Sequence, residues 1–139
     1  MYYLIYVSAA ARKLERKDLL DILDVSRRNN SAMGVTGILL FKDGSFMQLL
    51  EGEKAAVEEI FRRIEKDPRH RGIYRVHDGT ADSRSFAGWS MGFREVTTRD
   101  LEGIPGFTFV GGGDFLSDAI TENPSIALRI VKTFHDTNF

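Results

Sequence analysis

The sequence has 139 residues, 42% of them hydrophobic and 28% charged, and a formal net charge of −1, so it suits one soluble domain with a substantial core. Its interspersed charges argue against a nucleic-acid or anionic-membrane surface, and the absence of cysteine excludes disulfides, thiolate metal sites and cysteinyl adducts. The three histidines lack metal-ligand spacing, and no segment resembles a signal peptide or a transmembrane helix, so we expect a cytoplasmic domain without a metal site.

The first two predicted elements are a strand and a helix. Residues 2–8, YYLIYVS, alternate in a way that gives a β-strand apolar residues on both faces. Residues 15–30 predict a helix, because four residues follow helical spacing: Leu19, Ile22, Leu23 and Ser26. Asn30 lies about 20° from Leu19 around the helix axis at 3.6 residues per turn. The inner face of this helix therefore ends in amides.

The segment VTGILLFKDGSFMQLLEG predicts a β-hairpin, because two apolar runs flank Asp43-Gly44, a strong two-residue turn. This turn pairs Leu39 with Gln48 and places Gln48 on an interior face with apolar neighbours: Leu39, Phe41, Phe46 and Leu50. A buried amide without hydrogen-bond partners costs about 1–3 kcal/mol. We therefore expect a group inside the protein to satisfy Gln48.

One more helix and two more strands are expected in the core. Residues 53–66 predict a second amphipathic helix, which ends before Pro68. Strands are expected near 72–80 and at 89–95. The order β-α-β-β-α-β predicts an α+β fold, a ferredoxin-like sandwich with two helices on one face of an antiparallel-rich sheet.

The rest of the chain is expected to cover the other face of that sheet or to form a partner surface. A triple glycine at 111–113 has no phosphate-loop context, so we interpret it as a linker. A short helix is expected at 114–120, and Asn123-Pro124 predict the start of another whose apolar stripe contains Ile126, Ile130 and Phe134. We therefore divide the chain into a domain at 1–96 and a C-terminal helical extension at 97–139.

Three polar side chains converge in this topology. The first and third strands are the central pair and the first helix crosses them, so Tyr6, Asn30 and Gln48 meet at one end of a slot. Its expected walls are apolar: Ile22, Leu39, Phe46 and Ile64. The slot has no carboxylate pair, nucleophile–base pair or metal cluster, so we expect no enzyme. It suits a planar heteroaromatic ring with hydrogen-bonding edges, such as a flavin.

Six segments in order resemble the BLUF domain, a flavin-binding blue-light sensor: LIYVS (4–8), SRRNN (26–30), GVTGILLF (34–41), FMQLLEG (46–52), DPRH (67–70) and FAGWSM (86–91). The resemblance covers about residues 1–96. Beyond residue 96 the chain is similar to the short members of the family, which have helices after the core and no fused output domain.

The resemblance implies a non-covalently bound flavin, expected to be FAD, with FMN and riboflavin as the alternatives. It implies that light moves an electron and a proton from Tyr6 and that Gln48 then rotates or tautomerises, since an amide presents either a donor or an acceptor. It places further flavin contacts at Asn29, Asn30, Arg63, Arg69 and His70.

The same resemblance suggests how a signal leaves the site. Trp89 and Met91 are two residues apart in the expected fifth strand, so we expect them to share one face and to relay a change from Gln48. We expect the signal to loosen the tail at 124–136, to reach a separate effector protein, and to occur in a homo-oligomer formed partly by that tail.

Taken singly, each of these residues has an ordinary explanation. Tyr6 suits a strand core, Asn29 and Asn30 suit a helix C-terminus, and Trp89 and Met91 suit strand packing. Two other classes of protein stay open. One is a small phosphate-cleaving enzyme, disfavoured because Arg12 is the only arginine near the required loop. The other is a light-inactive ferredoxin-like module for ligand binding or dimerisation.

Overall fold

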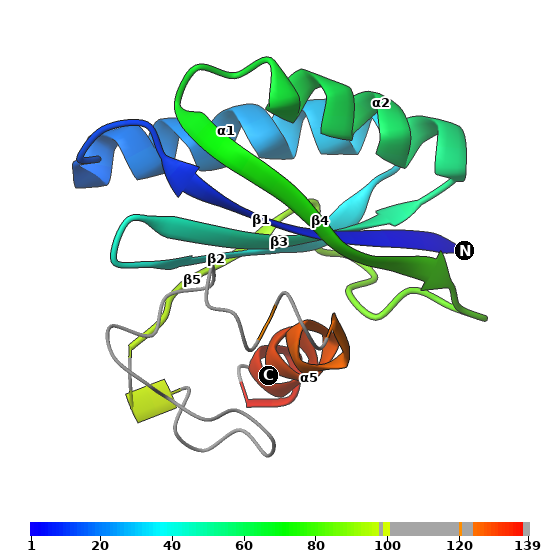
Figure 1. The fold of residues 1–139 in the computed structure, drawn as a ribbon. Coiled ribbons are helices and arrows are strands. Elements are labelled where there is room, and N and C mark those ends of the chain that lie inside the picture. Colours follow the sequence, from blue (N-terminus) through cyan, green and yellow to red (C-terminus); the bar gives the residue numbers. More distant parts are fainter. Residues whose placement is uncertain (98, 101–119, 121–123, 138–139) are drawn as a thin grey trace.

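The computed structural model of the chain describes residues 1–97, 99–100, 120 and 124–137. They form a mixed five-stranded sheet in the order β4-β1-β3-β2-β5, with helices packed on it (Figure 1). The elements in chain order are β1 (Tyr2–Ala10), α1 (Arg16–Met33), β2 (Thr36–Lys42), β3 (Ser45–Gly52), α2 (Lys54–Glu65), β4 (His70–Thr80), β5 (Gly92–Glu95) and α5 (Pro124–Thr137). The predicted ferredoxin-like α+β fold is confirmed, with β5 added in parallel to β2.

Helix α1 is longer than predicted at its C-terminal end. Glu15 and Asp18 form a capping box at its start, and Gly34 ends it in the left-handed conformation at φ 67°. Glycine reaches this conformation without a steric penalty. The helix therefore ends at Gly34, and its last helical residue is Met33. Asn30 is therefore inside α1, where it is buried with Leu19, Ile22 and Leu23.

The β2–β3 hairpin has the predicted register. Asp43 and Gly44 both have positive φ, at 47° and 83°, as a two-residue hairpin turn of this kind requires. Leu39 pairs with Gln48 in this hairpin. On the other side of β3, Tyr6 of β1 also pairs directly with Gln48, so the tyrosine, the glutamine and the leucine form one row across the centre of the sheet.

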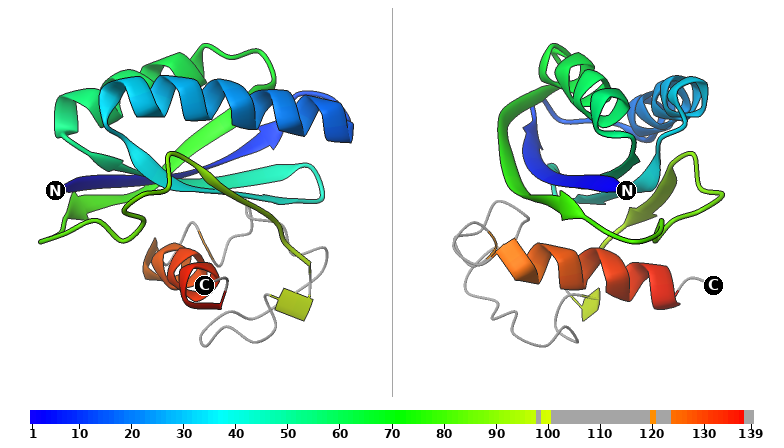
Figure 2. Two further views of the ribbon diagram at one scale, coloured as in Figure 1. Left: turned by 180° about the vertical axis from the view of Figure 1, so that it is seen from behind. Right: turned by 90° about the vertical axis from the view of Figure 1, so that its right-hand side faces the viewer.

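Each face of the sheet is covered by its own hydrophobic core. Helices α1 and α2 lie on one face and α5 on the other (Figure 2). The helix-face core includes Leu4, Tyr6, Leu39 and Leu50. The α5-face core joins alternate residues of the same strands to one stripe of α5: Ile126, Ala127, Ile130, Val131 and Phe134. The expected cover of the second face by a helix that starts at Pro124 is thus confirmed.

Other expectations for the tail concern residues outside the described part of the chain. The triple glycine at 111–113 lies there, as does the helix expected at 114–120, apart from Ile120, which belongs to the α5-face core. Within the described residues, no helix combines the length and apolar character needed to cross a bilayer.

The expectation of a strand at 89–95 is wrong in its first half. β5 begins at Gly92, and the residues before it form a turn in which the Trp89 N–H donates to Phe86 O at 2.9 Å. Trp89 packs against the α5-face core, whereas Met91 is buried in the helix-face core. The two residues therefore lie on opposite sides of the sheet and do not share a face, because this part of the chain crosses the sheet edge instead of running along it.

Candidate functional site

A pocket lies between α1, α2 and the helix face of the sheet. It contains most of the residues singled out in the sequence. The lining residues are Tyr6, Ile22, Val25, Ser26, Asn29, Asn30, Leu39, Gln48, Ile60, Arg63, Ile64, Asp67, Arg69 and His70. Phe46, Trp89 and Met91 are the predicted site residues that do not line it.

The inner end of the pocket holds a buried polar pair. Tyr6 is 1% exposed and Gln48 is 2% exposed. The Tyr6 hydroxyl donates to Gln48 Oε1, and Gln48 Nε2 donates to Met91 Sδ at 3.3 Å. Burial, and then the charge of Asp67, raises the pKa of Tyr6 above its ordinary value. The phenol thus keeps its proton, and Gln48 has one N–H hydrogen left for another acceptor.

Asn30 presents a second neutral group to the pocket. It is 1% exposed, and its Nδ2 donates to Ser90 O at 3.0 Å. No group among the described residues donates to its Oδ1. Asn30 lines the pocket and an amide oxygen is an acceptor only, so this atom suits a ligand that brings an N–H group. Asn29 lies beside it on the pocket wall.

The walls of the pocket are apolar and come from three elements. Ile22 of α1, Leu39 of β2 and Ile64 of α2 line it as predicted. Phe46 does not: it is fully buried, with its ring 4.7 Å from the ring of His70 and 4.9 Å from that of Phe41. Phe46 thus packs against His70 without lining the pocket itself.

Sequence reasoning missed two further wall residues, Val25 and Ile60. Helical spacing is the signal that could have identified them. Val25 is three residues after Ile22, and Ile60 is four residues before Ile64, so each shares a helix face with a predicted wall residue.

His70 connects the wall to β1. Its Nδ1 lies 2.9 Å from Ser8 Oγ, and its ring lies edge-on to that of Tyr6, with centroids 6.4 Å apart. Burial lowers the pKa of His70, Arg69 acts in the same direction, and Asp67 opposes them. The imidazole is therefore neutral at physiological pH and forms part of an uncharged site.

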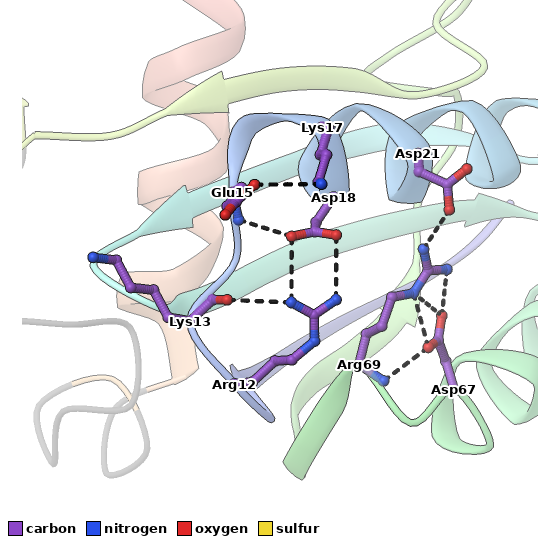
Figure 3. A network of polar contacts seen from close by, with 8 residues as sticks. All are labelled: Arg12, Lys13, Glu15, Lys17, Asp18, Asp21, Asp67 and Arg69. Atoms are coloured by element: carbon purple, nitrogen blue, oxygen red, sulfur yellow. Dashed lines mark hydrogen bonds and ion pairs between the residues drawn. The ribbon is translucent and has the colours of Figure 1, made fainter.

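Two arginines lie at the rim of the pocket, and both have carboxylate partners. Arg69 contacts Asp67 and Asp21, each at 2.8 Å, and it lies between them in Figure 3. Burial alone would raise the pKa of Asp67, but the hydrogen bonds and charge of Arg69 lower it overall. Arg63 pairs with Glu59 at 3.4 Å. Glu59 also pairs with Arg62, at 2.6 Å. Of the carboxylates that pair with the two rim arginines, Asp67 lines the pocket, and it was not predicted as part of the site.

The two predicted relay residues have different relations to the pocket. Met91 touches Gln48 through its sulfur, and its carbonyl accepts from Arg27 Nε at 3.1 Å. Trp89 lies on the α5 side, with its ring centroid 5.4 Å from that of Phe86. The structure therefore joins Met91 directly to the site and leaves Trp89 away from it.

This arrangement favours binding of a flat, neutral ring over acid–base catalysis. The walls are apolar, and the polar groups at the inner end are a phenol and two amides with unused hydrogen-bonding capacity. Among the described residues, no cluster of three or more histidine, aspartate or glutamate side chains could hold a metal ion. A flavin ring, which is planar and has hydrogen-bonding groups along one edge, fits this donor and acceptor set.

Comparison with known proteins gives a consistent result. The model of a family described as "Sensors of blue-light using FAD" matches residues 1–92. The chain is 37% identical over 89 residues to the photoactivated adenylate cyclase subunit beta of Euglena longa, a match that covers 63% of this chain and 10% of that protein. The chain thus spans about a tenth of the length of the first curated relatives.

Two solved structures resemble the chain over more of their own length. The dark-state structure of BlrB, described as a BLUF protein, is 26% identical, with a TM-score of 0.76 over 98% of this chain and 96% of that one. The photo-activated state of BlsA is 37% identical, with a TM-score of 0.68 over 73% of this chain and 74% of that one.

Proposed function

The chain belongs to the BLUF family of blue-light flavin photoreceptors, and on that premise we propose that it senses blue light through a flavin bound non-covalently between α1, α2 and the sheet. The observation that carries this proposal is the buried Tyr6–Gln48 pair at the inner end of an apolar pocket. Leucine would fill the same space as glutamine at this position, so packing alone does not explain the glutamine. Its amide group therefore calls for a functional explanation.

The unused polar groups of the pocket suit a flavin ring edge. Asn30 Oδ1 would accept from a ring N–H, and the second Gln48 N–H would donate to a ring nitrogen or carbonyl. Asn29 lies beside them, and Ile22, Leu39 and Ile64 would pack on the ring. We propose FAD as the flavin, and the ring-binding part of the pocket would equally hold FMN or riboflavin. Arg63, Arg69 and His70 would lie toward the side chain of the flavin.

A bound flavin would supply the blue-light absorption and would be the acceptor for an electron and a proton. Tyr6 holds the proton closest to Gln48, at its hydroxyl. A half-turn of the Gln48 side chain exchanges Oε1 and Nε2, so that the amide N–H faces the tyrosine oxygen. The bond that Gln48 gives up on the other side is to the sulfur of Met91, a weak acceptor. After the half-turn, the Tyr6 oxygen would accept from the amide instead of donating to it. The two orientations thus offer alternative hydrogen bonds, as a bistable switch requires.

We further propose that the signal passes to a separate effector protein and that the chain acts in the cytoplasm as a homo-oligomer. One relative is a photoactivated adenylate cyclase in which the matched segment is about 10% of the length, so a domain of this family can accompany an output activity. In this proposal residues 1–96 form the sensor, and the extension at 97–139 contributes to contacts with the partner or a second copy.

Illumination of the flavin-loaded chain tests the proposal. The purified protein should retain riboflavin or FAD until it is denatured, and its flavin absorption band should shift reversibly to longer wavelength under blue light. Tyr6→Phe keeps the ring and removes the proton donor, so this variant should bind flavin and show no shift. Absence of flavin binding, or binding without a shift in the unmodified chain, would contradict the proposed function.

A further inference from the structure

A second buried polar cluster lies on the opposite face of the sheet from Gln48. Glu51 follows Gln48 by three residues on β3, so its side chain points to the α5 face. It is 3% exposed. Its carboxylate accepts three hydrogen bonds of 2.8 Å each, from Thr36 Oγ1, the Ser85 N–H and the Phe86 N–H.

Arg84 extends this cluster without touching the carboxylate. Its guanidinium donates to Thr36 Oγ1 at 2.8 Å, to Gly34 O at 2.7 Å and to the main-chain carbonyl of Glu51 at 3.1 Å. Thr36 therefore accepts from Arg84 and donates to Glu51. Thr36 and Glu51 are also direct cross-strand partners, so the sheet itself holds this pair in place.

Two of the three groups that satisfy Glu51 are main-chain amides of one segment. A buried carboxylate is very costly unless hydrogen bonds compensate for lost hydration. Moving Ser85 and Phe86 away from β3 would leave that charge undersatisfied. The carboxylate thus fixes the start of residues 85–91, which we call the crossing segment.

The crossing segment passes from the α5 face to the candidate flavin site. Phe86 is buried in the α5-face core, and Trp89 O accepts from the Gly37 N–H at 3.1 Å. Its last two residues are then held by the site: Asn30 donates to Ser90 O, and Gln48 donates to Met91 Sδ. One end of this short segment is therefore bound to Glu51, and the other end to the two amides of the pocket.

We infer that Glu51 is a positioning residue for the Gln48 switch, because it fixes the segment that carries Met91 against the Gln48 amide. Thr36 and Arg84 support it in this role. The inference rests on the proposed function for its effect on light-induced changes, whereas its effect on the segment itself does not depend on flavin.

Glu51→Gln tests the inference with little change in shape. An amide oxygen can keep the bonds from Thr36 and Phe86, but the amide nitrogen then faces the Ser85 N–H, and that hydrogen bond is lost. Amide hydrogen exchange in the crossing segment should accelerate by about tenfold or more in the dark, as expected when one hydrogen bond to a charged group is lost. The return of the flavin absorption from the light to the dark state should also change severalfold.

Two further variants separate positioning from general destabilisation. Thr36→Val removes the hydroxyl that donates to Glu51 while keeping the shape, and it should produce the same changes to a smaller degree. Val57→Ala removes buried atoms of α2 that neither line the pocket nor belong to the crossing segment. It should lower stability and leave the rate of return unchanged.

The outcomes are distinct. Faster exchange confined to residues 85–91, together with an altered rate of return, supports the inference. It is overturned if the crossing segment exchanges no faster in Glu51→Gln than in Val57→Ala, or if the rate of return is the same as in the unmodified chain. If the unmodified chain shows no light-induced shift, the proposed function fails, and the exchange data alone then support or overturn the anchoring role of Glu51.

Discussion

The buried polar groups on the two faces of the sheet differ in how fully they are hydrogen-bonded. Gln48 and Glu51 lie three residues apart on β3, and both are almost fully buried. Gln48 bonds to Tyr6 and Met91 and keeps one N–H hydrogen for the pocket. Glu51 has its carboxylate occupied by one hydroxyl and two main-chain amides. Unused hydrogen-bonding capacity, more than polarity, therefore distinguishes a binding group from an anchoring group.

The packing of the two faces differs in the same sense. On the α5 face, side chains of α5 meet the sheet in one continuous core. On the helix face, a pocket lies between α1, α2 and the strands. The helix face is thus less completely packed than the α5 face, which agrees with the proposed ligand site on the helix face and with a stabilising role for the α5 face. Five substitutions or measurements test this division of roles.

Making the helix face apolar at its centre should have the largest effect. Gln48→Leu replaces the amide by a side chain of similar size, so the light-induced absorption shift should disappear completely while flavin remains bound. The substitution also leaves the buried Tyr6 hydroxyl without its acceptor, so the free energy of unfolding should fall by about 1–3 kcal/mol. Light-minus-dark absorption spectra and urea unfolding measure both effects. A normal shift in this variant would show that Gln48 is not the switch.

Damage to the α5-face core should affect stability and spare the site. Ile130→Ala removes a fully buried side chain of α5, which should lower the free energy of unfolding by about 2–5 kcal/mol. Flavin affinity and the light-induced shift should remain at temperatures where the variant is folded. Urea unfolding followed by circular dichroism measures the loss. A variant that unfolds like the unmodified chain but loses flavin would contradict the assigned roles.

Removing the second amide should weaken flavin binding. In Asn30→Ala a ligand N–H loses its acceptor and Ser90 O loses its donor, which should cost about 1–3 kcal/mol, or roughly 5- to 150-fold in Kd. Asn29→Ala, at a partly exposed position on the pocket wall, is the matched control and should change Kd less. Fluorescence titration with riboflavin measures both, and equal losses in the two variants would remove Asn30 from its proposed place.

The neutral state of His70 predicts a modest pH dependence. Its pKa is lower in the folded protein than the value of about 6.5 in an unfolded chain. Below that value the unfolded state binds a proton that the folded state does not, so His70 reduces stability as pH falls, by at most about 1.4 kcal/mol per pH unit. His70→Asn retains a polar atom near Ser8, and it should remove the contribution of His70 to the change of unfolding free energy with pH. If the free energy of unfolding depends on pH in the same way in His70→Asn and in the unmodified chain, the burial of His70 is contradicted.

The smallest effect is expected at the rim. Arg69 is engaged by Asp67 and Asp21, so a flavin phosphate gains little there, and riboflavin and FMN should have Kd values within about fivefold, as for an exposed ion pair. Asp67→Asn should lower the Kd of FMN relative to that of riboflavin, because one of the two carboxylates that pair with Arg69 becomes a neutral amide. A much stronger preference for FMN in the unmodified chain would show that the phosphate displaces the carboxylates.

Local sequence signals were sufficient for the central part of the site. The Asp43-Gly44 turn determines the register that puts Gln48 opposite Leu39, and helical spacing turns Asn30 inward. Both follow from repeats of two and 3.6 residues, so the convergence of Tyr6, Asn30 and Gln48 needed only the order of the elements. The same reasoning placed the apolar stripe of α5 correctly.

Features that depend on contacts distant in sequence could not be predicted in this way. Strand alternation was applied to Trp89 and Met91, but that part of the chain turns across the sheet edge, where Gly88 has a φ of 84°. Asp21 and Arg69 are far apart in sequence and meet only because α1 passes the start of β4. Glu51 resembled the end of a strand, and its role depends on main-chain amides of a loop, which leave no residue pattern.

The most direct test of the central claim uses the fact that Gln48 is the only glutamine in the sequence. Protein made with glutamine labelled at the side-chain amide nitrogen gives nuclear magnetic resonance signals from Gln48 alone. In the flavin-loaded chain, these side-chain signals should move under blue light and return in the dark, and in Tyr6→Phe they should stay in place. Signals that are the same in the dark and in the light, in a sample whose flavin absorption does shift, would contradict a change in the hydrogen bonding of Gln48.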